Sequence, residues 1–318
     1  MSDGFPRFAE LPVRPGAPAG SSWGVFGDRD EIGTLNFVGP EQALAAARLV
    51  RTGKVFSLNW DLSLPSPPFF GRANLRHTVF PKHDGWAADD YLDSFWPQCS
   101  SQWDGLRHFA DPGHGFYNGV TLEEATTDGQ GRLGMEHWAR RGIAARGVLL
   151  DVARFVEDEG RPLDPFDFFP IGPDLLERIA EHSGARLGPG DVLLFRTGWI
   201  EAYEKLGQRE REELAAQGRP GCPGLYGDDV PAWLWDNRIA AVASDNPGLE
   251  AGHPRKGSDL RLHKALIARL GMPLGEFWEL DALAADCVED GVREFLLTSA
   301  PLNLAGGVGS PPNALALK

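Results

Sequence analysis

Four polar side chains lie close together in the stretch "PQCSSQWDGLRH", which begins at Pro97. Gln98 and Gln102 are four residues apart, Asp104 follows two residues later, and His108 comes four residues after that. Carboxylate and amide oxygens suit hard cations such as Mn²⁺ or Mg²⁺, whereas Zn²⁺ favours histidine and cysteine. A turn that gathers these side chains predicts an oxygen-rich metal site or an acid/base pair, and capping of local backbone is the simpler structural alternative.

A second group of polar residues lies far along the chain, in 244–279. His263 stands beside the apolar stripe of "RLHKALIARLG", where a lone histidine is usually structural. Glu276 follows after "GMPLG" and is either an acid near a site or a surface residue of the next turn. His114 and Tyr117, in "GHGFYNG", could bind substrate, although such residues are also typical of turns.

Tryptophans gather near the first group, at Trp86, Trp96 and Trp103. They predict an apolar or aromatic small-molecule substrate that stacks beside the polar groups. Contacts in the core or between subunits are the alternative. Because Trp103 alternates with Gln102 and Asp104, its ring points away from them if the segment is extended.

Composition excludes several classes of partner. The net charge of -14 and the pI near 5.0 oppose binding to nucleic acid or to anionic membrane surfaces, which needs clustered lysines and arginines. No apolar run approaches the roughly 20 residues of a membrane span, and the first residues lack the pattern of a signal peptide. We therefore expect a cytoplasmic protein.

Cysteine usage and sequence motifs exclude several kinds of site. Cys99, Cys222 and Cys287 are widely spaced and odd in number, so we expect free thiols rather than a disulfide framework or a CxxC zinc site. Cys99 has no neighbouring base that would make it a nucleophile. Neither a G-x-S-x-G nucleophile elbow nor a phosphate-binding loop is present.

Strand and helix patterns alternate along the chain, which predicts an α/β or mixed α+β fold. Short apolar runs bounded by Gly, Pro and Asp predict strands within 54–64, 146–155, 190–200, 239–247 and 294–304. Helical spacing predicts helices within 39–54, 172–184, 201–217 and 260–271. The Pro- and Gly-rich residues 1–22 predict an N-terminal arm, and residues 23–318 a single catalytic domain.

Seven segments together resemble one known family, in the family's order: "DEIGTLNF", "QWDGLRH", "YNG", "RGVLLDV", "GDVLLFRTGW", "SDNPGLE" and "PLNLAGGVGSPPNALAL". The chain resembles the putative cyclase family that includes kynurenine formamidase and isatin hydrolase. The family signature H-x-G-T-H-x-D-x-P-x-H aligns with "QCSSQWDGLRH". Glutamines replace its first two histidines, Ser100 and Ser101 its Gly-Thr pair, and Leu106 its proline, which would place this chain in a divergent subgroup.

The resemblance implies a swivelling β/β/α domain with a central mixed sheet, assembled as homodimers or homotetramers in which neighbours help to close the site. It implies a metal-dependent hydrolase, with His108 in the place of the acid/base histidine. Matching the family's metal-binding histidines and aspartate, and its later His and Glu, gives the implied metal residues: Gln98, Gln102, Asp104, His263 and Glu276.

Three functions follow as hypotheses. The leading one is a metal-dependent hydrolase of a cyclic or acyl amide or a lactone, using Mn or Zn, or else Mg, with His108 as the proton shuttle. An amide oxygen is a weaker ligand than imidazole, so the alternative is a metal-free cyclase, dehydratase or lyase. That enzyme would work by acid/base chemistry of Asp104, His108, His263 and Glu276. The third is a ligand-binding homologue without catalysis.

Overall fold

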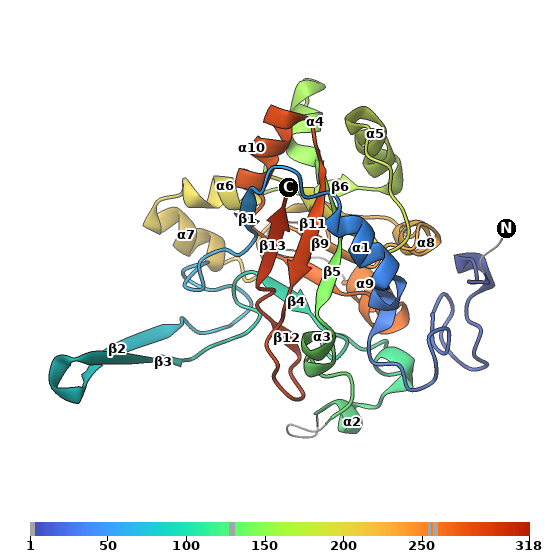
Figure 1. Cartoon of the computed structure of the whole chain (residues 1–318), viewed down its shortest axis with the longest axis horizontal. Helices are drawn as coiled ribbons and strands as arrows, with labels where there is room; N and C mark the ends of the chain where they lie inside the picture. Colours follow the sequence, from blue (N-terminus) through green and yellow to red (C-terminus); the bar gives the residue numbers. More distant parts are fainter. Residues whose placement is uncertain (1–3, 127–130, 254–255, 257–259) are drawn as a thin grey trace.

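A nine-stranded mixed sheet forms the centre of the protein, in the strand order β1-β13-β11-β5-β7-β9-β10-β4-β12 (Figure 1). The computed structural model describes residues 4–126, 131–253, 256 and 260–318. The strands of this sheet are β1 (Val55–Ser57), β4 (Gln102–Asp104), β5 (Ile143–Asp151), β7 (Val192–Arg196), β9 (Ala241–Ser244), β10 (Leu274–Glu276), β11 (Glu294–Ser299), β12 (Gly309–Ser310) and β13 (Ala314–Leu317). The predicted α/β fold with a central mixed sheet is confirmed.

Helices surround the sheet, and two short strand pairs lie outside it. The α-helices are α1 (Pro40–Ala47), α2 (Leu122–Thr126), α3 (Glu136–Arg141), α4 (Val152–Asp158), α5 (Pro173–Ser183), α6 (Trp199–Glu204), α7 (Gln208–Ala215), α8 (Val230–Asp236), α9 (Arg261–His263) and α10 (Asp281–Asp290). The outlying pairs are the antiparallel β2 (Arg76–Lys82) with β3 (Ala87–Asp93) and the parallel β6 (Phe169–Ile171) with β8 (Pro223–Leu225).

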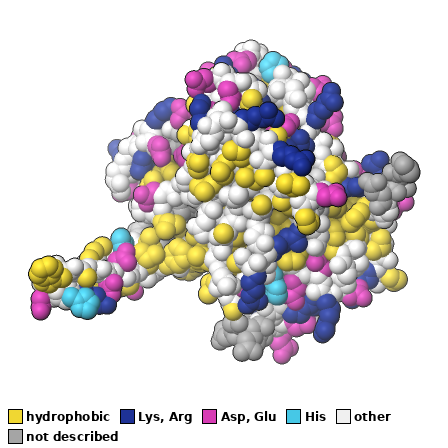
Figure 2. All heavy atoms as spheres, viewed as in Figure 1, with side chains coloured by type: hydrophobic (Ala, Val, Ile, Leu, Met, Phe, Trp, Pro, Cys, Tyr) yellow, Lys and Arg dark blue, Asp and Glu magenta, His cyan; other side chains and the backbone are white. Residues whose placement is uncertain are grey.

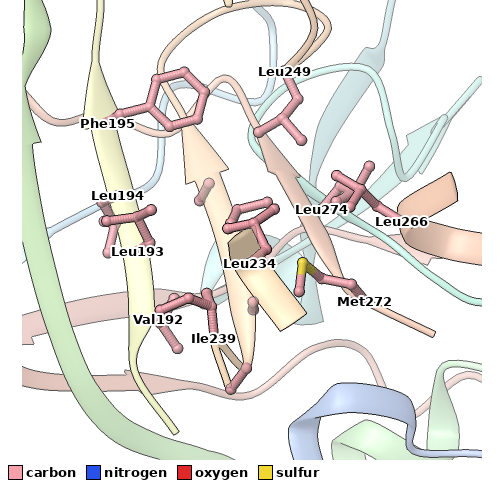
Figure 3. Close-up of a cluster of buried hydrophobic side chains, with 14 of the residues drawn as sticks. Val192, Leu193, Leu194, Phe195, Leu234, Ile239, Leu249, Leu266, Met272 and Leu274 are labelled. Atoms are coloured by element: carbon pink, nitrogen blue, oxygen red, sulfur yellow. The ribbon is translucent and has the colours of Figure 1, made fainter. Parts of the chain in front are cut away.

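The middle of the sheet is parallel and deeply buried. Strands β5, β7, β9 and β10 run parallel to one another, and every residue from Val192 to Phe195 is fully buried. Such unbroken apolar runs are typical of strands covered on both faces. Figure 3 shows this core, in which Leu234 of α8 and Leu266 lie near the strands. The resulting platform holds the short strands β10 and β4 at one side of the sheet.

Four predicted elements differ from the structure in their boundaries. The helix predicted within 39–54 starts at Pro40 as expected but ends at Ala47. The region 201–217 forms two helices, because Gly207 adopts an extended conformation and starts α7. The strand predicted within 54–64 keeps only three residues, since beyond them Asn59 turns to a bridge with Trp278. The strand predicted within 146–155 is displaced, since β5 runs from Ile143 to Asp151 and α4 begins at Val152. The strands predicted within 190–200, 239–247 and 294–304 contain β7, β9 and β11.

A two-stranded arm projects from the body at residues 76–93 (Figures 1 and 2). Strands β2 and β3 pair with each other from Arg76 opposite Asp93 to Lys82 opposite Ala87. Every residue of β3 is exposed, and Trp86 at the turn is 91% exposed. The arm therefore exposes both apolar and charged side chains to solvent, including the Trp86 ring.

The described part of the predicted N-terminal arm runs along the body. The Phe8 backbone donates to Asp236 at 2.8 Å, and the Trp235 indole donates to the Pro6 carbonyl at 2.9 Å. Ser22 is fully buried and donates to the Leu270 carbonyl at 2.9 Å. Contacts with the body thus order residues that show no periodicity of their own.

Two expectations about the whole chain can be compared with the described residues. All three cysteines are free thiols, as predicted. Among the described helices, none combines the length and the apolar character needed to cross a membrane.

Candidate active site

Strands β4 and β10 place the acidic side chains of the site. Their antiparallel register sets Glu276 opposite Gln102 and Leu274 opposite Asp104. Directly opposed residues project from the same face of a sheet, so the carboxylates of Asp104 and Glu276 share one face with the Gln102 amide. Their exposed fractions are 0% for Gln102 and Asp104 and 4% for Glu276.

Two tryptophans fill the other face of the same strand pair. The Trp103 and Trp278 rings meet edge to face, with centroids 4.6 Å apart. The Trp278 indole donates to the Gln102 carbonyl at 3.0 Å, and the Trp103 indole donates to Ser299 at 2.9 Å. A Cβ at Gly275 would lie 2.7 Å from the Trp278 indole nitrogen, so glycine is required there. This packing holds the strand pair in place, so that the Asp104 and Glu276 side chains project from the opposite face.

His263 is clamped against the acids by Glu250. One oxygen of Glu250 accepts from the His263 backbone N–H at 2.8 Å and from ring Nδ1 at 2.6 Å. The other ring nitrogen, Nε2, then faces the strands, 3.2 Å from Glu276 Oε1 and 3.8 Å from Asp104 Oδ2. A six-residue π-helix, Lys264–Arg269, follows at once. Such π-helical turns are frequent at functional sites.

Glu250 is the site residue that the motif search did not single out. It is the last residue of "SDNPGLE", and the Asn246 side chain shapes this loop by accepting from the backbone N–H of Leu249 at 2.7 Å. Glu250 is 4% exposed. The sequence signal for Glu250 was its position as an acid just after a Pro-Gly turn that follows a buried strand. Only the fold shows that it lies against His263.

Three of these residues form a group able to bind a cation. Their ligand atoms, from Asp104, His263 and Glu276, all lie within 4.8 Å of one another. Asp104 Oδ2 and the neighbouring Gln102 Oε1 are buried oxygens without a hydrogen-bond partner. Buried polar atoms are normally partnered, so these two oxygens mark a place for a positively charged group or a donor.

Burial and mutual contact shift the pKa values in this group. Burial alone lowers the pKa of His263, but its hydrogen bonds to Glu250 and Glu276 outweigh that effect and raise the pKa to about 9. Burial, with the Asp104 charge nearby, raises the pKa of Glu276. For Glu250, burial opposes ionisation, yet the bond to His263 dominates and lowers the pKa. Without a cation, His263 is therefore an imidazolium at neutral pH.

His108 forms the outer edge of the site, with 23% of its side chain exposed. The Gln98 amide donates to Asp104 Oδ1 and also to His108 Nδ1, the latter at 3.1 Å. The remaining nitrogen, His108 Nε2, lies 3.7 Å from Asp104 Oδ2. Burial lowers the pKa of His108 more than the Asp104 charge raises it, so the ring is neutral near pH 7.

The structure thus brings together all six residues that the family resemblance placed at the metal or acid/base positions. Gln102 completes the set, since its amide donates to Glu276 Oε2 across the strand pair. The six are Gln98, Gln102, Asp104, His108, His263 and Glu276.

The three tryptophans predicted to bind substrate lie in three different surroundings. Trp86 is at the turn of the projecting arm, and Trp96, 46% exposed, lies where the arm rejoins the body. Trp103 is fully buried and packs on Trp278, away from Gln102 and Asp104, as its alternation predicted. Their part in substrate binding stays a prediction.

His114 and Tyr117 belong to a turn region with its own contacts. His114 pairs with Asp111 at 2.6 Å, and the fully buried Tyr117 donates to Asp30 at 3.1 Å. No contact joins either residue to Asp104 in the described part of the chain. Their predicted role as substrate ligands also stays a prediction.

Comparison with known proteins places this geometry in context. The sequence pattern of the putative cyclase family matches residues 60–251. A crystal structure described as a novel cyclase is 35% identical, with a TM-score of 0.84 over 94% of this chain and 99% of that one. Comparison with curated protein sequences gives no match.

Isatin hydrolases share the fold at lower identity. Isatin hydrolase A from Labrenzia aggregata, bound to benzyl benzoate, is 18% identical, with a TM-score of 0.58 over 87% of this chain and 97% of that one. An isatin hydrolase bound to the product analogue thioisatinate is 20% identical, with a TM-score of 0.55 over 88% and 99%. The extent of the family match and the 35% identical structure together show that this chain belongs to the putative cyclase family.

Proposed function

We propose that this protein is a metal-dependent hydrolase that opens a cyclic or acyl amide or a lactone, with Mn²⁺ as the preferred cation. The observation that carries the proposal is the pair of buried oxygens without partners, Gln102 Oε1 and Asp104 Oδ2, beside His263 Nε2 and Glu276. The isatin hydrolases that share the fold support a hydrolytic reaction as the starting point.

The charge balance of the site fits a divalent cation. Asp104, Glu250 and Glu276 are all buried carboxylates, and His263 contributes one positive charge when protonated. Once His263 gives up that proton to act as a ligand, the three carboxylates have no positive partner, and a divalent cation would offset two of their charges. Buried charge is costly unless it is paired or bound to metal. Carboxylate and amide oxygens with one imidazole suit Mn²⁺ or Mg²⁺ better than Zn²⁺.

The residues that would hold the cation are Asp104, His263 and Glu276, with Gln102 and Gln98 as amide ligands. A divalent cation supplies Lewis-acid polarisation of a carbonyl group and activates water. Glu250 fixes the His263 ring so that Nε2 faces the acids, the usual role of a carboxylate behind a ligating histidine. Gln98 fixes the His108 ring in the same way, from Nδ1.

His108 would move the proton. Because the Gln98 amide donates to Nδ1, the neutral ring carries its proton on Nε2. Nε2–H can therefore donate a hydrogen bond to a substrate carbonyl. A second proton would enter at Nδ1, with the Gln98 amide turned to accept from it, and Nε2–H of the charged ring would then be a general acid for the leaving group. The lowered pKa of His108 returns the ring to its neutral form after each cycle.

A metal-free cyclase, dehydratase or lyase is the second candidate, and one observation favours it. Both glutamine amides donate to the acids, Gln98 to Asp104 and Gln102 to Glu276, so each carboxylate has a partner for one oxygen without a cation. The imidazolium of His263 would supply the positive charge. In that case chelators leave the activity unchanged, whereas they abolish it in a metal-dependent hydrolase.

The proposed partners are an apolar or aromatic small molecule and further copies of this chain, as a homodimer or homotetramer. The projecting arm supports self-association, since a lone two-stranded hairpin is marginally stable in water. Its exposed apolar side chains include Val79 at 63%, Trp86 at 91% and Tyr91 at 50%. Packing against a second copy would remove them from water.

Substituting Asp104 with asparagine tests the cation site. The amide keeps the shape but removes the negative charge, so we expect the Mn²⁺ affinity of the variant to fall by roughly a hundredfold or more. Calorimetric titration and elemental analysis measure this loss. Asp191→Asn is the matched control, because Asp191 is 2% exposed but pairs with Arg146 outside the site. Equal Mn²⁺ binding by wild type and Asp104→Asn would contradict the proposal.

The pH dependence of cation binding follows from His263. A ligating imidazole must lose its proton, and His263 stays protonated below its pKa of about 9. Each bound cation therefore releases a proton at lower pH, and affinity rises by roughly tenfold per pH unit until it levels off above that pKa. Calorimetry in buffers of different ionisation enthalpy counts the protons. Glu250→Gln should flatten the profile, and a flat wild-type profile would exclude His263 as a ligand.

Removing the arm tests self-association. Arg76 and Asp93 are opposed at its base, so a short Asn-Gly turn can replace the residues between them without disturbing the body. We expect light scattering to give a dimer or tetramer for the wild type and a smaller species for the shortened chain. A wild type that is monomeric at assay concentrations, or an unchanged mass after removal, would refute the role of the arm.

A further inference from the structure

Two arginines flank the acidic site on segments that touch each other. Arg72 follows Phe70, whose backbone N–H donates to the Gly218 carbonyl at 3.3 Å, and Arg219 comes directly after that glycine. The two loops therefore form one wall. Phe69 anchors the first loop, since it is 2% exposed and stacks on Phe277, the neighbour of the site acid Glu276.

Arg72 contacts a residue of the site, and Arg219 lies beside the loop that carries Glu250. The Arg72 guanidinium donates to the Gln98 carbonyl, and its charge helps to lower the pKa of His108. Arg219 rests on Gly248, two residues before Glu250, where an added Cβ would lie 2.8 Å from its Nη2. The glycine leaves the space that the guanidinium occupies.

Neither arginine has an acidic partner among the described residues. Arg219 makes no hydrogen bond or ion pair to any residue that the structure describes, although it is partly buried. Elsewhere, partly buried arginines of this acidic chain pair with carboxylates, as Arg146 does with Asp191 and Arg196 with Asp281. Two guanidinium groups without acids, beside a site rich in acids, leave donors free for an incoming anion.

We propose that the substrate carries a carboxylate group and that Arg219, assisted by Arg72, binds it. This inference rests on the proposed function, whose substrate class it narrows to amides or lactones with an anionic substituent. The planar guanidinium fork matches a carboxylate in shape and charge. Binding there would hold the scissile bond toward His108 and the Asp104–Glu276 pair while it keeps the negative group away from the buried carboxylates.

Benzoate and its uncharged counterpart benzamide test the proposal as probes of the whole protein. We expect saturable benzoate binding to the wild type, measured by calorimetry with and without Mn²⁺, and weaker binding of benzamide. Arg219→Gln should weaken benzoate binding by roughly tenfold or more, because a charged hydrogen-bonding partner is lost. Arg219→Lys should restore part of the affinity, and Arg209→Gln, on the exposed side of α7, should leave it unchanged.

Gly248→Ala provides a second variant that keeps every charge. Its methyl group would push the guanidinium aside, so it should also weaken benzoate binding while melting and Mn²⁺ content stay as in the wild type. Unchanged benzoate affinity in both variants, absence of saturable binding to the wild type, or stronger binding of inorganic phosphate would overturn the proposal. Loss of Mn²⁺ binding with intact, Arg219-dependent benzoate binding would instead refute the metal-dependent function alone.

Discussion

Buried charge is the constraint on which the rest of this structure depends. Asp104, Glu250 and Glu276 are each at most 4% exposed, and among the residues that the structure describes His263 faces all three. One imidazolium cannot balance three carboxylates, and uncompensated charge in a protein interior is expensive. Either protons or a cation must supply the remaining positive charge. The raised pKa values of His263 and Glu276 are the response of the metal-free chain to this imbalance.

Apolar packing in the surrounding fold offsets the free-energy cost of burying these charges. The parallel strands β5, β7 and β9 form an apolar platform, and β10 and β4 continue it with three residues each. Trp103 and Trp278 fill one face of this short pair and leave the other face to the acids. The loop after β9 brings Glu250 behind His263, where it accepts from the ring, and a π-helix begins directly after this histidine. Apolar packing on one face of the strand pair therefore lies directly behind the groups that oppose folding.

The sequence predicted the residues of this site better than it predicted the residues and elements that position them. Alternation in "QWD" was enough to separate Trp103 from Gln102 and Asp104. The aligned signature brought in His108, and the family's later His and Glu brought in His263 and Glu276. Glu250 was not predicted, because its role depends on a contact with His263, which lies thirteen residues further along the chain. The early end of α1 and the short β1 were missed for a related reason, since tertiary contacts and not local propensity set those limits.

Anomalous diffraction from crystals soaked in Mn²⁺ tests the central claim most directly. A cation at the buried carboxylates should give a strong anomalous peak bounded by Asp104, His263 and Glu276, with Gln102 Oε1 facing the peak. An empty difference map there, with the glutamine amides still donating to the two acids, would contradict a metal-dependent hydrolase. It would leave acid/base chemistry without metal as the function of the site.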